Sequence, residues 1–326
     1  MKDKVVTKHK RAFVGLAGAT ALMAALTACG GNQGTAAGED GGLSGTVQVD
    51  GSSTVGPLST AAAEFFQEEN PGVQVTVGIS GTGGGMEKFC NGELDVTGAS
   101  RPMKEEEAAI CDENGVAFEE FHVANDALTV VVSKENDWAD CLTVEQLTAI
   151  WEPDSQITNW NQVDDSFPDE PLELFGAGTD SGTFDYFTEA INGEEGATRT
   201  DYTPSEDDNV TVQGVSGSPG GMGYFGFSYF EENADNLNAV SIDNGEGCVA
   251  PSVEAVQDGS YAPLSRPLFI YPTASALERP EALAFVEFFV AEHAQIAEDA
   301  LFIPLNPEQE EELNADLAAL KENTDS

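Results

Sequence analysis

Short apolar strands alternate with amphipathic helices along most of this chain, and this alternation restricts the fold more than any other feature. Runs rich in β-branched residues and bounded by glycine, asparagine or proline predict strands at 46–50, 73–78, 95–98, 127–133 and 172–176. Apolar residues at helical spacing predict helices at 57–69, 104–113, 143–151, 184–191, 280–290 and 307–320. The pattern favours an α/β fold with largely parallel sheets.

Four turns rich in glycine, serine and threonine directly follow predicted strands. They read DGSSTVGP (50–57), SGTGGGME (80–87), GASRP (98–102) and GAGTDSGTFD (176–185). Free backbone N–H groups, hydroxyls and the dipole at a helix N-terminus together favour an anion. Four glycines within six positions of the second turn also let the backbone approach a ligand closely. One such turn is more often a plain helix cap, but four in one chain predict an anion-binding site.

Arg101 stands in the third turn, where its guanidinium can present a fixed pair of donors to an oxyanion. A structural salt bridge is the alternative for this residue. The second turn lacks the Gly-Lys-Ser/Thr ending of a nucleotide P-loop, and the chain has no G-x-G-x-x-G in a suitable unit. Both nucleotide-binding patterns are therefore excluded.

The N-terminus has the pattern of a bacterial lipoprotein signal. A basic region is formed by Lys2, Lys4, Lys8, Lys10 and Arg11. The uncharged stretch 12–25 then has about 14 residues, too few to span a hydrocarbon core of roughly 30 Å as a permanent helix. It ends at Leu26-Thr27-Ala28-Cys29, which predicts a signal peptide at 1–28 and lipidation of Cys29. An ordinary signal peptide with a chance cysteine is the alternative. Residues 29–44 predict a flexible tether.

Composition excludes several classes of function. The chain carries 13 Lys and Arg against 58 Asp and Glu, and 8 and 57 of these remain beyond the signal. Such a surface argues against nucleic-acid binding and is interpreted as a solvated acidic coat. Three histidines, one of them in the signal, are too few for a typical zinc centre, so no metal site is expected. The four cysteines after Cys29 favour disulfides in an exported protein, and three pairings are possible.

The four turns, in this order, resemble the phosphate-binding proteins of bacterial ABC importers, the PstS family. The resemblance is to the branch that reads DGSST, SGTGGG, ASRP and GTDSGTFDYF, and it covers about 47–305. It continues through DCLTV (140–144), ITNW (157–160), SEDDNV (205–210) and GYFGF (223–227). It implies a type II periplasmic-binding-protein fold, in which two α/β lobes with central mixed sheets are joined by a hinge. Lobe I would take 45–125 plus 265–326, and lobe II 126–264.

The resemblance also implies the biology. The chain would be a monomeric, non-catalytic binding protein without cofactors that passes inorganic phosphate to the membrane subunits of an ABC importer. The predicted lipid would hold it on the outer face of the cytoplasmic membrane or in a periplasm. Within the implied lobes, the disulfides Cys90–Cys111 and Cys141–Cys248 are expected, because each pair then stays inside one lobe.

Matching positions imply the ligand contacts. These would be Ser53 and Thr54, then Ser80 or Thr82, then Ser181, Gly182 and Thr183. Many relatives place an aspartate after the G-A-S turn and an arginine shortly before S-G-T. Here Arg101 stands at the first place, while Ala177 and Gly178 occupy the second.

We therefore hypothesise that the charged pair has exchanged lobes. Arg101 would be the cationic contact, and Asp180 would accept the hydrogen bond that protonated phosphate donates and sulfate cannot. Three alternatives stay open: a binder of another oxyanion, a phosphate-ester hydrolase with Ser181 as nucleophile, and an adhesion or signalling protein that keeps the fold. The hydrolase lacks a G-x-S-x-G pattern and has only His122 or His293 as a base.

Overall fold

The structure, a computed structural model, describes residues 42–179 and 181–324. The predicted signal peptide, the lipidation site Cys29 and the candidate acceptor Asp180 lie outside these residues, as does the tether up to residue 41. Within the described residues the predicted alternation of strands and helices is confirmed. Two differences matter for the fold: the strand predicted at 127–133 begins six residues earlier, at Phe121, and the strand at Ser265–Pro272 was not predicted.

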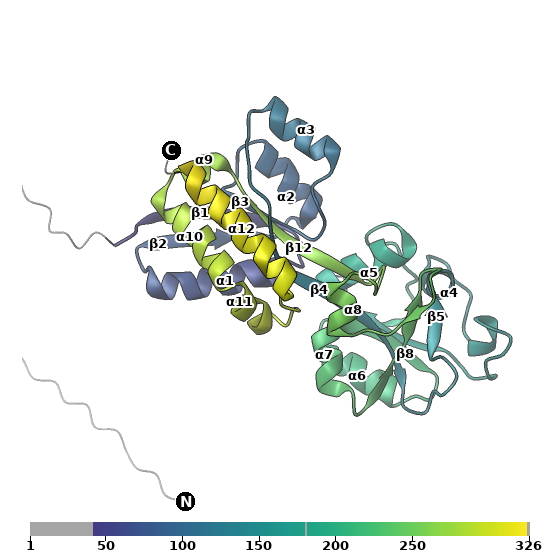
Figure 1. The fold of residues 1–326 in the computed structure, drawn as a ribbon. Helices are drawn as coiled ribbons and strands as arrows, with labels where there is room; N and C mark the ends of the chain where they lie inside the picture. The colour runs from purple at the N-terminus through teal and green to yellow at the C-terminus, as the bar shows by residue number, and fades with distance from the viewer. Residues whose placement is uncertain (1–41, 180, 325–326) are drawn as a thin grey trace, which may run out of the picture. The chain divides into compact units, whose positions relative to one another are not determined.

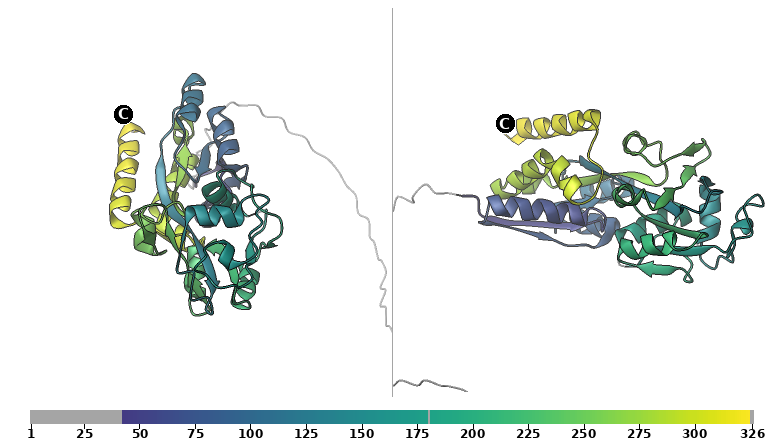
Figure 2. Two further views of the ribbon diagram at one scale, coloured as in Figure 1. Left: turned by 90° about the vertical axis from the view of Figure 1, so that its right-hand side faces the viewer. Right: turned by 90° about the horizontal axis from the view of Figure 1, so that it is seen from below.

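Lobe I, as we call the first half of the fold, is built on three parallel strands. They are β2 (Val73–Val77), β1 (Gly45–Gly51) and β3 (Val96–Ala99), with β1 in the middle. The helices that follow them are α1 (Gly56–Glu69), α2 (Gly81–Cys90) and α3 (Glu105–Glu113). The C-terminal helices complete this half: α9 (Ala274–Leu277), α10 (Pro280–Ala291), α11 (His293–Asp299) and α12 (Pro307–Thr324). Figure 2 shows α12 lying along the outside of lobe I.

Two strands carry the chain between the halves. They are β4 (Phe121–Ser133) and β12 (Ser265–Pro272). The early part of β4 pairs with β12, whereas Leu128 to Val132 pair with β8 in the other half. Since β4 leaves lobe I and β12 returns to it, the two run antiparallel, and the sheet is mixed rather than largely parallel.

Lobe II, the second half, continues the same sheet. The full strand order is β2-β1-β3-β12-β4-β8-β6-β7, and β9 also pairs with β4. The strands of this half are β6 (Glu173–Ala177), β7 (Thr203–Ser205), β8 (Gly221–Gly226) and β9 (Leu237–Ala239). A separate three-stranded sheet contains β5 (Cys141–Thr143), β10 (Ser241–Asp243) and β11 (Cys248–Val249).

Five helices and one 3₁₀ turn surround the strands of lobe II in the described residues. They are α4 (Val144–Trp151), η1 (Trp160–Gln162), α5 (Gly182–Asn192), α6 (Asp208–Ser216), α7 (Phe227–Asn233) and α8 (Val253–Gln257). Figure 1 shows them grouped around β8, apart from the helices of lobe I.

Each lobe has its own large hydrophobic core. In lobe I, Phe66 of α1 packs edge-on against Phe285 of α10, with ring centroids 5.5 Å apart. In lobe II, Trp151 packs against Tyr224 with centroids 5.1 Å apart. Two cores connected by β4 and β12 are the architecture expected of a two-lobe binding protein. The residue bounds of the lobes given above stay a prediction.

The predicted disulfide pairing is confirmed. Cys90 of α2 is bonded to Cys111 of α3, and Cys141 of β5 is bonded to Cys248 of β11. Each bond therefore lies within one lobe, as the expected architecture requires.

Candidate anion-binding site

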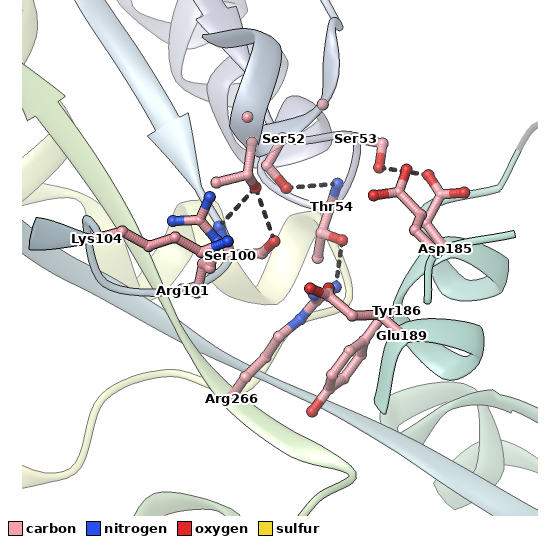
Figure 3. A pocket seen from close by; sticks show the side chains of 14 residues that line it. Ser52, Ser53, Thr54, Ser100, Arg101, Lys104, Asp185, Tyr186, Glu189 and Arg266 are labelled. Atoms are coloured by element: carbon pink, nitrogen blue, oxygen red, sulfur yellow. Dashed lines mark hydrogen bonds between the residues drawn. The ribbon is translucent and has the colours of Figure 1, made fainter. Parts of the chain in front are cut away.

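A cavity of about 210 Å³ lies where the two lobes face each other. Lobe I lines it with Ser52, Ser53, Thr54, Gly81, Thr82, Gly83, Ser100, Arg101 and Lys104, and β12 adds Arg266. Lobe II lines it with Asp185, Tyr186, Glu189 and Glu195. Figure 3 shows the hydroxyls and cations meeting the acidic side chains of α5 across the cavity.

The turn after β1 presents two hydroxyls to the cavity. Gly51 allows β1 to end against β3, since a Cβ there would lie 2.2 Å from the carbonyl oxygen of Gly98. Ser52 is buried, and its Oγ accepts the backbone N–H groups of Thr54 at 3.2 Å and Val55 at 3.4 Å. This bonding fixes the turn. The side chains of Ser53 and Thr54 are then held at the cavity wall (Figure 3).

Arg266 forms the floor of the cavity and touches both lobes. Its Nη2 donates to Thr54 Oγ1 at 2.5 Å, and its guanidinium lies 3.4 Å from the ring centroid of Tyr186 on α5. Behind it, Nε donates to the buried carboxylate of Asp126 on β4 at 3.2 Å. Burial raises the pKa of Asp126, although the charge of Arg266 lowers it in part. An arginine held from behind in this way can present its remaining donors to an oxyanion.

The N-terminus of α5 brings an acceptor to the opposite wall. Ser181 caps this helix by accepting the N–H of Thr183 at 3.2 Å. One turn further, Asp185 Oδ2 accepts the hydroxyl of Ser53 at 3.2 Å, so the two lobes are in contact here. Burial raises the pKa of Asp185, and Glu189 raises it further, whereas Ser53 and Arg266 lower it.

Arg101 lines the cavity from the other side, but part of its guanidinium is already engaged. Its Nη1 and Nη2 donate to the two carboxylate oxygens of Glu107 on α3, at 2.8 and 2.7 Å. The bond to Glu107 raises the pKa of Arg101, so the side chain stays charged. Next to it, the hydroxyls of Thr82 and Ser100 are 3.1 Å apart.

The residues expected at the site fall into three groups. Ser53, Thr54, Thr82 and Arg101 line the cavity. Ser181, Gly182 and Thr183 stand beside it at the start of α5, where a Cβ on Gly182 would be 3.0 Å from Ser53 Oγ. Ser80 points away and donates to Asp50 at 2.9 Å, so Thr82 is the better of the two candidates.

Sequence reasoning missed Arg266 and Asp185. Arg266 lies on a strand without a Gly/Ser turn, and Asp185 lies inside a helix pattern. One feature of the sequence could have pointed to Arg266: arginine is scarce in this chain, and Arg266 is one of four arginines after residue 28.

Within the described residues, no group of metal ligands is found and no histidine lines the cavity. None of their His, Cys, Asp and Glu side chains form a group of three that could hold a metal ion. His122 Nε2 lies 3.0 Å from the carbonyl oxygen of Ala124, His293 Nδ1 lies 2.8 Å from that of Val290, and neither histidine lines the cavity. No helix in the described ranges is long and apolar enough to cross a membrane.

Comparison with known proteins agrees with this fold and cavity. A family model described as a PBP superfamily domain matches residues 35–293. This match and the two-lobe fold define the chain as an α/β binding protein of that superfamily. Protein SphX of Synechococcus elongatus is 49% identical over 262 residues, which cover 79% of this chain and 77% of that protein.

Two further similar proteins show which family within the superfamily the chain belongs to. The phosphate-binding protein PstS of Staphylococcus saprophyticus is 38% identical over 294 residues, which cover 89% of each chain. The crystal structure of a possible phosphate binding protein from Planctomyces limnophilus has a TM-score of 0.82 and 49% identity, and covers 85% of this chain and 99% of that one. The chain belongs to the PstS family.

Proposed function

We propose that the cavity binds inorganic phosphate and that the chain delivers it to the membrane subunits of an ABC importer. The observation that carries the proposal is the convergence of Arg266, Arg101 and the hydroxyls of Ser53 and Thr54 on one cavity. Its wall also holds Asp185, a partly buried acceptor, whereas the other two carboxylates of the lining are exposed. The relatives named as phosphate-binding proteins support the choice of anion.

The donors and the acceptor act on different parts of the anion. The two arginines and the hydroxyl of Thr54 stabilise its negative oxygens by charge-assisted hydrogen bonds. The hydroxyl of Ser53 can do the same once it turns from Asp185 to the anion. Asp185 accepts a hydrogen bond from the protonated oxygen that phosphate still has near neutral pH. Sulfate has no proton to donate, so one of its oxygens would face this carboxylate without a hydrogen bond and be repelled, at a cost of about 1–3 kcal/mol or more. We therefore assign the acceptor role to Asp185, while the hypothesis for Asp180 stays a prediction, since that residue lies outside the described ones.

The acidic surface does not prevent anion binding. Glu189 and Glu195 line the cavity but are exposed, so water and salt screen their charge. The donors of Arg266 and Thr54 act at hydrogen-bond distance and dominate the equilibrium affinity. Association at low salt is expected to be slowed by the net charge.

The remaining features of the proposal concern location and assembly. The signal pattern at residues 1–29 supports an extracytoplasmic lipoprotein that acts as a monomer on the membrane surface or in a periplasm. The protein is proposed not to be an enzyme, because the described residues place no histidine at the cavity beside a hydroxyl.

The test is a titration of residues 30–326, which contain the whole compact unit from Gly42 onward. Bound ligand is removed by partial unfolding and refolding, and phosphate and then sulfate are titrated by calorimetry. Saturable one-to-one binding of phosphate without sulfate heat is expected. Folded, ligand-free protein that gives no phosphate heat would refute the proposal. Turnover of p-nitrophenyl phosphate, assayed in the same preparation, would favour the hydrolase instead.

A further inference from the structure

Helix α3 is attached to the rest of lobe I through little buried surface. Within its nine residues, all in the described part of the chain, Cys111 is the only one that is buried. Ile110, the other large apolar side chain of this helix, is 47% exposed. Hydrophobic burial normally holds a surface helix in place. Here that contribution is concentrated at the cysteine.

Helix α2 also depends on an external anchor. Four of its ten residues are glycine, which gives the chain high conformational freedom and weakens a helix. One of these glycines is needed for close packing: a Cβ on Gly85 would lie 2.5 Å from the Cα of Gly51 on β1. The first turn has no side-chain cap, and the buried residues Met86, Phe89 and Cys90 all lie in the second half.

The ends of these two helices that point to the cavity carry part of the site. Gly81, Thr82 and Gly83 of α2 line the cavity, and so do Arg101 and Lys104, which precede α3. Glu107, in the first turn of α3, holds Arg101 by two hydrogen bonds and also accepts the backbone N–H of Lys104 at 2.8 Å. Any movement of α3 is therefore passed directly to the Arg101 guanidinium.

The Cys90–Cys111 disulfide joins the opposite ends of the same helices. Cys111 follows Glu107 by one helical turn, on the same face of α3. Figure 1 shows α2 and α3 side by side, apart from the layer of α1 and α10. Their small core contains Met86, Phe89, both cysteines and Tyr271 and is separate from the main core of lobe I.

We propose that the Cys90–Cys111 disulfide is a positioning element of the anion site, which fixes α3 and through Glu107 the direction of Arg101. The inference rests on the proposed function only for its ligand. A link that pre-organises a binding wall improves affinity because less order is lost when the ligand binds. This disulfide closes a short loop, with a sequence separation of 21 residues. It is therefore expected to add less to the free energy of unfolding than Cys141–Cys248, which closes a longer one.

The second disulfide is a matched control within the same chain. Cys141–Cys248 joins β5 to β11 in the small sheet of lobe II, and no described residue of that sheet lines the cavity. It closes a sequence separation of 107 residues, so the loop-entropy account assigns it the larger effect on global stability. Loss of Cys90–Cys111 is thus expected to lower mainly the phosphate affinity, and loss of Cys141–Cys248 mainly the global stability.

The experiment compares the parent protein (residues 30–326), Cys90→Ala with Cys111→Val, and Cys141→Ala with Cys248→Val. Each is measured by phosphate calorimetry, thermal unfolding without phosphate, and hydrogen exchange of its backbone amides. The first variant is expected to bind phosphate about tenfold more weakly, with faster exchange confined to α2 and α3. The second is expected to unfold at a lower temperature, with phosphate affinity within about twofold of the parent.

Each other result has a defined meaning. Unchanged affinity and unchanged exchange in α3 of the first variant would overturn the proposal. So would a loss of cooperative folding in that variant, because the bond would then support the lobe as a whole. If the parent itself binds no phosphate, the proposed function fails, and the exchange of residues 105–113 alone decides whether the disulfide positions α3.

Discussion

The two lobes approach each other closely at Gly182, and a methyl group added there gives a sharp test of lobe closure. A Cβ at this position would lie 3.0 Å from both Ser53 Oγ and Thr54 N, and 3.1 Å from the carbonyl carbon of Ser53. Ordinary van der Waals contact begins at about 3.5 Å, and two of these atoms belong to the backbone, so the lobes must separate by several tenths of an ångström.

The size of the effect follows from overpacking. Forcing one methyl into a packed contact costs about 1–3 kcal/mol, which corresponds to roughly a 5- to 150-fold loss of phosphate affinity. The ligand-free protein can relieve the clash by opening. Its thermal midpoint should therefore stay within about 2 °C of the parent.

Calorimetry of Gly182→Ala and Gly226→Ala measures this difference. Gly226 lies at the end of β8 with φ −60°, and a Cβ there would have no atom within 4 Å, so this control should bind as the parent does. Parent-like affinity of Gly182→Ala would refute the idea that the lobes close through this contact. An equal loss of affinity and thermal stability would show that the contact belongs to the fold and not to closure.

Three further experiments use substitutions at the site and at one acidic group of lobe II. Arg266→Gln should weaken phosphate binding by about 100-fold in calorimetry. It should also lower the thermal midpoint, because the buried carboxylate of Asp126 loses its partner. Adding Asp126→Asn should restore the thermal midpoint but not the phosphate affinity. Asp185→Asn should lose discrimination against sulfate in competition titrations; unchanged selectivity would exclude it as the acceptor. The raised pKa of Asp185 means that its ionised form is unfavourable in the folded protein. The Asn variant should therefore be slightly more stable than the parent at pH 7 and lose that advantage as the pH falls towards 3.8, where the parent carboxyl is protonated in the fold. Burial and the charge of Asp207 raise the pKa of Asp208 to about 6. The folded protein therefore carries an unfavourable charge on Asp208 at pH 7 but not at pH 4, so Asp208→Asn should raise the thermal midpoint only at pH 7. An equal rise at both pH values would contradict this.

Local sequence patterns were sufficient for the four turns and for many of the elements, although β12 and α6 were not predicted. The turn at 50–57 contains the glycine that lets β1 end against β3 and the serine that fixes the loop, and both roles are short-range. The start of β4 was missed because His122, Asn125 and Asp126 interrupt its apolar run. These polar residues are tolerated there, since the strand runs between the lobes and each side chain finds a partner.

The charged part of the site could not be found from local patterns. Arg266 and Asp126 are 140 positions apart and meet only because β4 and β12 pair antiparallel. Arg101 lines the cavity, but the pattern gave no reason to expect Glu107 to accept hydrogen bonds from two of its nitrogens. To predict such contacts, one must know which distant strands pair with each other. The spacing of apolar residues along one sequence does not contain that information.

The crystal structure of the refolded protein grown with phosphate tests the central claim most directly. We predict one tetrahedral anion between the lobes, within hydrogen-bond distance of Arg266 and the Ser53–Thr54 turn, with Asp185 accepting from one of its oxygens. Phosphate bound only elsewhere, or a cavity holding water alone at saturating phosphate, would contradict the account.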